Sequence, residues 1–240
     1  MLVIKFEKND EDSQDYSLDF LKVRGEQKMT VLMYRKYNDQ GGEKKWMKLV
    51  HENPEVLRRK YFMEYLETYK NSIKMLQILD KDFAINDFNI KELKTLEILD
   101  FGGPNPRIEM DQLNAFVDFE KLMNLKIVMM ANAIFSFEQI LQFRGKVLTV
   151  ASQDFVQETV EKYLKMLEND EVPYTSLVIN RLNENIVDYA KMIEGLLNVS
   201  DFKNDNGVYC TFNFVSKTGK EIGVIISHSF FATTTQHLKF

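Results

Sequence analysis

The alternation of residues 125–181 constrains the fold of this chain more than any other feature of its sequence. Three apolar, β-prone runs occupy residues 125–130, 147–151 and 177–180, and two segments with helical spacing separate them. The first of these segments begins at Ser136 and has Gln139 three positions later, a pair that predicts a capping box. The order strand, helix, strand, helix, strand favours parallel strands joined by helical crossovers.

The second helical segment, after residue 154, carries its apolar residues along a single stripe. A helix that is half-buried against a sheet requires such a stripe, with polar residues on its other side. We therefore expect one helix face here to pack on the parallel strands. The stripe consists of Phe155, Val156, Val160, Tyr163, Leu164 and Leu167.

The remainder of the chain also reads as strands and helices. We expect strands at residues 2–6, 18–23, 29–34, 75–79 and 96–101, and a surface loop at residues 38–45. Helices are predicted at residues 54–71, 110–116 and 183–197, and residues 203–207 are interpreted as a polar link. At the C-terminal end, residues 208–216 and 221–231 predict a β-hairpin whose turn holds Gly219 in a left-handed conformation.

The strand starts predict how these elements are arranged. From residue 75 onward they recur every 20 to 30 residues or so, which is near the period of leucine-rich repeats but uneven. We therefore expect an α/β fold with an irregular, leucine-rich-repeat-like layer of parallel strands and helical crossovers, with N-terminal short strands and a C-terminal hairpin. Residues 1–50 are expected to form a β-rich segment packed on a main domain of residues 51–240.

Composition argues against several classes of protein. The net charge of −5 and the pI near 5.4 argue against a surface dedicated to nucleic acid. A single cysteine, Cys210, allows no disulfide within the chain and suits a reducing compartment. The first apolar run is too short for a signal peptide, and no run is long enough to span a membrane. We expect a cytoplasmic or nuclear protein that does not bind membranes.

A search for catalytic, cofactor-binding and metal-binding residues predicts none. His51, His228 and His237 are far apart in sequence, with no paired Cys/His spacing for zinc. Cys210 sits in an apolar strand context, where it is more typical of a small buried residue than of a nucleophile. Residues 101–107, FGGPNPR, resemble a turn more than a phosphate-binding loop, because no Gly-Lys follows and two prolines lack N–H groups. The acids Glu168, Asp170 and Glu171 are expected to be solvated.

Some residues could contact a protein partner, although each also has a simpler interpretation. Trp46 is either a partly buried anchor or a binding hot spot. The basic cluster of residues 58–60 is interpreted as a solvated helix face, balanced by neighbouring acids. Among the aromatic residues, Phe135, Phe230 and Phe231 would be tested first for contact with a partner, although a role in the core is the simpler interpretation of each.

From about residue 96 to residue 231, the sequence resembles the type 2 F-box-associated domain of nematode F-box proteins. The resemblance covers a little over half of the chain and consists mainly of the spacing of apolar residues, together with a similar C-terminal hairpin. The hairpin differs from the family pattern, since residues 216–220 lack its Arg and Asp-Gly. The matching residues are Ser136, Phe137, Glu138, Ile140, Leu141, Lys146, Val147, Leu148, Val150, Ser152, Phe155, Val160, Leu164, Lys165 and Leu177.

This resemblance implies a protein-binding function without catalysis. In the family, the domain is thought to select the protein that a cullin-RING ubiquitin ligase modifies, while a separate F-box docks the ligase adaptor. No F-box pattern precedes Trp46, so we expect binding of an unknown substrate protein without binding of the adaptor. Two alternatives stay open, a small cytosolic enzyme whose site is built from distant residues and a decoy that competes for substrates.

Overall fold

The computed structural model describes most of the second half of the chain and separate segments of the first half. In strands β1 to β4 and at residues 181 and 205, the description is of the backbone alone. The described residues are 2–6, 15–22, 30–37, 43–50, 63, 67, 70–71, 73–78, 90–101, 107–173, 175–181, 196, 199–205 and 209–235.

The chain divides into two compact units. Unit 1 comprises Met1–Asn105 and Asp111–Phe119, and unit 2 comprises Pro106–Met110 and Glu120–Phe240. The first fifty residues thus belong to the same unit as the strands near residues 75 and 99. The division expected from the sequence, at residue 50, stays a prediction.

Unit 1 contains a sheet in the order β6-β5-β1-β2-β3-β4. Strands β5 and β6 are parallel, whereas the other neighbours are antiparallel. The helix α2 (Met110–Phe116) contributes Phe116, whose ring meets that of Phe101 edge-on at 5.9 Å between centroids. The strands are β1 (Leu2–Phe6), β2 (Asp15–Lys22), β3 (Thr30–Tyr37), β4 (Glu43–Val50), β5 (Ile73–Ile78) and β6 (Ile98–Asp100).

All five strands predicted in this unit are confirmed, and one predicted loop is partly wrong. Residues 43–45 were expected in a surface loop, but they begin β4, which pairs with β3 over eight residues. Residues 38–42 of that loop and residues 102–106 lie outside the described part of the chain. So does most of the predicted helix at residues 54–71, of which Met63 and Glu67 are described as helical.

Unit 2 begins with the predicted order of three parallel strands and two crossover helices. After the short helix α3 (Phe119–Met123) come β7 (Ile127–Ile134), α4 (Phe137–Leu141), β8 (Val147–Ser152), α5 (Gln157–Glu168) and β9 (Ser176–Arg181). Strand β8 is parallel to both β7 and β9. The capping box is confirmed, because Ser136 N–H donates to Gln139 Oε1 at 2.7 Å and Gln139 N–H donates to Ser136 Oγ at 3.3 Å.

Four antiparallel strands extend this sheet in the order β9-β13-β12-β11-β10. They are β10 (Ser200–Asp205), β11 (Tyr209–Val215), β12 (Glu221–Ser227) and β13 (Phe230–Thr234). The predicted hairpin is confirmed as β11–β12, and Gly219 in its turn has φ of 86°.

Two predictions in this half are wrong, and one falls on residues that are not described. The return strand predicted to reach residue 231 ends at Ser227, whose Oγ accepts from Ser229 N–H at 3.2 Å and from Phe230 N–H at 3.0 Å. The chain then turns back as β13. Residues 203–205, interpreted as a polar link, belong to β10. Apart from residue 196, the predicted helix at residues 183–197 lies outside the described part of the chain.

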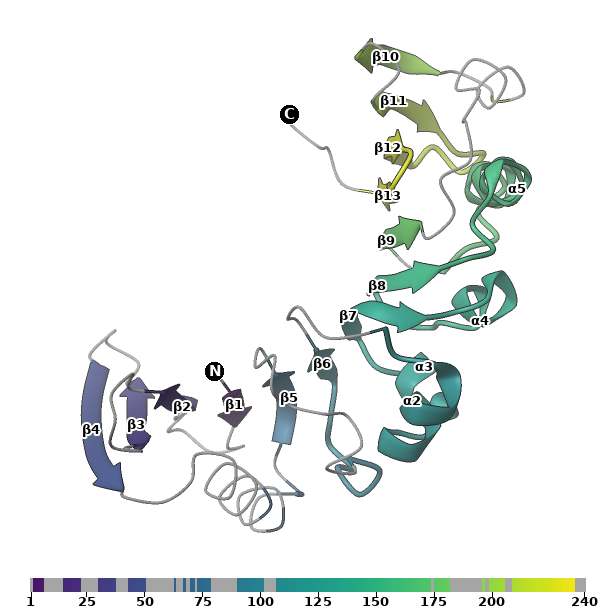
Figure 1. The fold of residues 1–240 in the computed structure, drawn as a ribbon. Coiled ribbons are helices and arrows are strands. Elements are labelled where there is room, and N and C mark those ends of the chain that lie inside the picture. The colour runs from purple at the N-terminus through teal and green to yellow at the C-terminus, as the bar shows by residue number, and fades with distance from the viewer. Residues whose placement is uncertain are drawn as a thin grey trace. The chain divides into compact units, whose positions relative to one another are not determined.

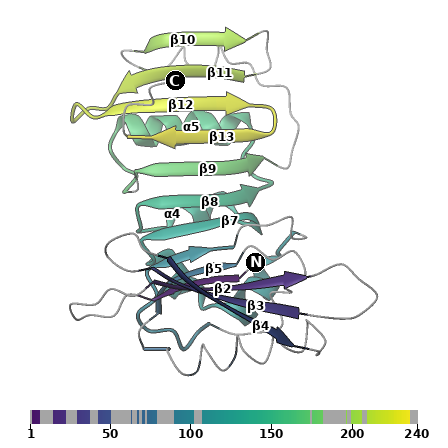
Figure 2. The same cartoon turned by 90° about the vertical axis from the view of Figure 1, so that its left-hand side faces the viewer.

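The fold class is therefore a mixed α/β one, as predicted. In both Figure 1 and Figure 2, helices α4 and α5 lie on the same side of the unit 2 strands. The cores of the two units are described separately, and that of unit 2 lies between this sheet and these helices. No helix in the described residues is long and apolar enough to cross a membrane.

Candidate protein-binding surface

The sheet of unit 2 buries one of its faces under α4 and α5. Successive residues of a strand alternate between the two faces of a sheet. On β8, β9, β11, β12 and β13, the residues of this side whose side chains are described are fully or almost fully buried. An aromatic cluster anchors the helices, since the ring of Phe231 on β13 lies 5.0 Å from that of Phe155 and 5.6 Å from that of Tyr163. Phe155 also meets Phe137 of α4 at 6.0 Å. Buried residues of the strands on this side include Leu148, Val150, Leu177, Ile179, Phe212, Phe214, Val224 and Ile226.

The alternate residues of the same strands form the opposite face, which we call the helix-free face because the described helices α4 and α5 lie on the other side of the strands. Figure 2 looks onto it, with the strands in front of α4 and α5. The strand pairings place its residues in rows; one row runs Thr149, Val178, Ala232, Ile225, Thr211 across five strands. The face consists of Ile127, Met129, Val147, Thr149, Ala151, Ser176, Val178, Asn180, Phe230, Ala232, Thr234, Glu221, Gly223, Ile225, Ser227, Tyr209, Thr211, Asn213 and Val215.

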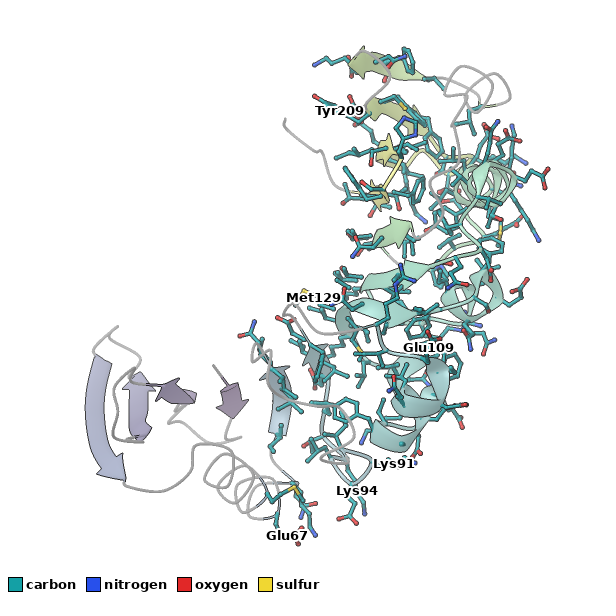
Figure 3. The ribbon with its side chains drawn as sticks, in the orientation of Figure 1. Glu67, Lys91, Lys94, Glu109, Met129 and Tyr209 are labelled. Carbon is teal, nitrogen blue, oxygen red and sulfur yellow. The ribbon has the colours of Figure 1, made fainter. Side chains whose placement is uncertain are left out.

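The helix-free face is apolar and partly exposed. Most of its residues keep part of their surface in contact with solvent, and Tyr209 and Val215 are 40% and 38% exposed. In Figure 3, Met129 and Tyr209 point away from the side that carries the helices. Among the residues that define the face, Glu221 is the one that carries a charge, and the exposed Lys203 of the edge strand β10 borders the face beside Thr211. Aliphatic, aromatic, hydroxyl and amide groups therefore form this face.

The outer edge of the sheet, β10, has features that hinder the addition of another strand. Its register with β11 shifts between Ser200 and Lys203, and Asp201 has a left-handed φ of 54°. Charged and polar residues at positions 201–204 are exposed, although Phe202 is also 42% exposed. Irregularity and charge are common devices by which edge strands avoid pairing with other chains. The face, rather than this edge, is therefore the better candidate for a partner.

An ionic cluster at the C-terminal end of α5 fastens the β11–β12 turn to the helix. Asp170 follows α5 in a left-handed conformation, with φ of 59°. Its carboxylate accepts hydrogen bonds from Ser216 Oγ at 3.0 Å and Thr218 N–H at 3.0 Å, and Lys220 Nζ lies 2.9 Å away. The hydrogen bond from Lys220, with further ones from Thr218 and Ser216, lowers the pKa of Asp170 to about 2.

The prediction that Glu168, Asp170 and Glu171 are solvated is therefore wrong for two of these three acids. Asp170 has a side chain that is 13% exposed and takes part in this cluster. Glu168 is buried, with a side chain 6% exposed, and forms an ion pair with Lys165 at 3.1 Å. Glu171 is exposed, as predicted. The partners of Asp170 lie nearly fifty positions further along the chain, so local sequence patterns carry no signal for them.

Of the residues considered for chemistry, Cys210 and His228 lie in the described part of the chain. Cys210 is fully buried on the helix side of β11, and burial raises the pKa of its thiol to about 12, as predicted for a small core residue. His228 lies in the turn between β12 and β13, while His51 and His237 are outside the described residues. Within the described residues, no group of three or more His, Cys, Asp or Glu side chains is placed to hold a metal ion.

The aromatic residues chosen for testing divide between the two faces of the sheet. Phe135 and Phe231 are 1% and 0% exposed, so they belong to the core, which is the simpler role given to them above. Phe230, the neighbour of Phe231, lies on the helix-free face and is partly exposed. Trp46 lies on β4, opposite Tyr34 of β3, and its side chain is outside the described part. Of these residues, Phe230 is the one that the structure retains as a possible contact.

Comparison with models of known protein families, with curated proteins and with solved structures finds no match to this chain.

Proposed function

We propose that this chain is a protein-binding module without catalytic activity, and that it binds its partner through the helix-free face of unit 2. The observation that carries this proposal is that a broad, partly exposed face of the sheet is composed almost entirely of uncharged residues. We also propose that the parallel strands and crossover helices form an irregular leucine-rich-repeat-like layer. In this role the chain would resemble the substrate-recognition part of F-box subunits of ubiquitin ligases.

Apolar surface is unfavourable when it is exposed to water. Burial of apolar surface is worth roughly 25 cal/mol per Å², and a contiguous exposed apolar patch often marks a site of interaction. Val178, Ile225 and Phe230 lie close together on neighbouring strands of this face, each partly exposed. A protein surface that covered them would gain this free energy on binding.

The titratable groups with shifted pKa values support a binding role over an enzymatic one. Asp170 is held by the cluster that fastens the β11–β12 turn, and Cys210 lies in the core. Lys70 has a raised pKa because Glu67 accepts its hydrogen bond and lies beside it as an anion. Each shift is explained by burial or by neighbouring charged and polar side chains. In the described residues, we find no specific observation that favours the alternative of a small enzyme.

A photocrosslinking experiment tests this proposal. A photoreactive phenylalanine analogue would replace Thr149 on the helix-free face in one variant and Glu158, exposed on the far side of α5, in a control variant. We expect the Thr149 variant to crosslink a discrete protein in a cell extract and the Glu158 variant to crosslink none. Adding Ile225→Lys should abolish the crosslink, because binding would then bury an unpaired charge.

Two results would contradict the proposal. Equal crosslinking from Thr149 and Glu158 would mean that the face has no special role, and a crosslink insensitive to Ile225→Lys would mean the same. The proposed resemblance to F-box proteins has a separate test, in which purified ligase adaptor is mixed with the chain. We expect no stoichiometric complex with the adaptor, and formation of one would refute this part of the proposal.

A further inference from the structure

We infer that, when no other partner is present, the helix-free face of unit 2 is covered by the same face of a second copy of this chain. The inference rests on the proposed function in one respect, since it uses the same binding surface. It goes further by naming the occupant of that surface, which is the same apolar and nearly uncharged surface of a second copy.

The charge of the face favours a second copy as its partner. In a two-fold symmetric pair, a surface meets itself, so that residues near the symmetry axis face their own copies. A charged surface would then place like charges against one another, which is unfavourable. The helix-free face reduces this cost because its one charged residue, Glu221, lies at the start of β12. The charged residue that continues the central row, Lys203 of β10, lies at the edge of the sheet beyond Thr211. A surface of this composition is complementary to itself.

The size of the face also suits a pair of copies. Six strands contribute about three residues each, and with neighbouring strands ~4.8 Å apart and same-face residues ~6.7 Å apart they span roughly 600 Å². Stable interfaces bury about 800 Å² of accessible surface on each partner. Because side chains raise the accessible area above that of the flat lattice, the helix-free face is of the size that a stable pair needs.

The central row has a shape that fits the same row of a second copy. Ala232 on β13 lies between Val178 on β9 and Ile225 on β12. Because the alanine side chain is smaller than its two branched neighbours, the surface has a shallow depression at Ala232. Two sheets that pack face to face interdigitate their side chains across a layer ~10 Å thick, and this alternation allows branched residues of one copy to fit over Ala232 of the other.

Sedimentation velocity of the purified full chain tests the inference. We expect a dimer at about 50 µM that persists when the salt concentration is raised roughly tenfold, because screening does not weaken an uncharged interface. Ile225→Lys should shift the chain to monomer at the same concentration, since it buries an unpaired lysine against its own copy. Glu158→Lys, a charge change of the same kind on the exposed side of α5, should leave the dimer intact.

Folding must be separated from association in this test. Far-ultraviolet circular dichroism and urea unfolding would show whether Ile225→Lys retains the native fold. Val178→Lys, in the same row, provides an independent variant if it does not. A wild-type chain that is monomeric at about 50 µM would overturn the inference, as would a dimer that survives both substitutions in folded protein.

The outcomes also separate this inference from the proposed function. A monomeric chain whose Thr149 analogue crosslinks a different protein would overturn the second-copy inference and support the proposed function. A dimer broken by Ile225→Lys, together with no captured protein in the extract, would support the inference and contradict the proposed function. A crosslink between two copies through Thr149 would support the inference directly.

Discussion

The two faces of the unit 2 sheet are made by the same strands, yet they differ in what covers them. On the helix side, Leu148, Leu177 and Phe231 have no exposed surface. On the other side, the neighbouring residues Thr149, Val178 and Phe230 are partly exposed. Because successive residues of a strand lie on opposite faces, the residues of one face can differ in character from those of the other. One face can hold the fold together while the other is free to bind.

The largest expected effect comes from opening the aromatic cluster on the helix side. Phe155→Ala removes a ring that contacts Phe137, Tyr163 and Phe231. Loss of a buried phenylalanine leaves a cavity and destabilises a protein by about 3–5 kcal/mol. Urea unfolding should therefore show a lower midpoint for this variant. Thr149→Ala on the helix-free face is the control and should cost under about 1 kcal/mol; equal losses would mean that both faces serve the fold alike.

A smaller loss is expected at Gly145, where other backbone and side-chain atoms lie close to the chain. A Cβ atom at Gly145, between α4 and β8, would overlap Leu125 O and the Phe143 ring and come within 2.8 Å of Lys126 O. Lys146 N–H and Arg144 N–H bond to Lys126 O and Met123 O on either side, so the backbone has little room to move. Gly145→Ala should cost about 1–3 kcal/mol of unfolding free energy. An unchanged urea midpoint would mean that this crossover is looser than the contacts indicate.

The weakest expected effect on stability concerns the ionic cluster that fastens the β11–β12 turn, and it depends on pH. Because the folded pKa of Asp170 is about 2, below its ordinary value of 3.8, its carboxylate stabilises the fold above pH 4. This contribution disappears as the pH falls through about 2. Asp170→Asn, which keeps a residue tolerant of left-handed backbone, should remove this part of the pH dependence. Urea unfolding at pH 3 and at pH 6 measures it, and Glu171→Asn is the matched control. Identical pH profiles for Asp170→Asn and the wild type would contradict the role given to Asp170.

Local patterns in the sequence were enough to predict the parallel half of unit 2. The serine and glutamine of the capping box and the stripe led by Val160 and Tyr163 act within a few residues of each other, and the structure confirms both. The α/β class and the burial of Cys210 were predicted from the same local patterns. Such patterns succeed because the periods of helices and strands are properties of short segments.

Features that depend on contacts between distant segments were missed. The turn at His228 and Ser229 lacks glycine, proline and asparagine, so residues 221–231 read as one strand, although they form β12 and the start of β13. The insertion of β13 beside β9, which makes the helix-free face continuous, depends on a pairing over about fifty residues of sequence. The candidate surface could not be predicted for this reason, although Phe230 was among the residues chosen for testing.

The most direct test of the central claim compares two adjacent residues of the same type, Phe230 and Phe231, which lie on opposite faces of β13. Phe231→Ala should lower the free energy of unfolding by about 3–5 kcal/mol. Phe230→Ala should lower it by less than about 1.5 kcal/mol and should instead reduce crosslinking from the helix-free face. Urea unfolding of the two variants, measured side by side, decides the matter. Equal destabilisation by both substitutions would contradict the claim that the two faces have different roles.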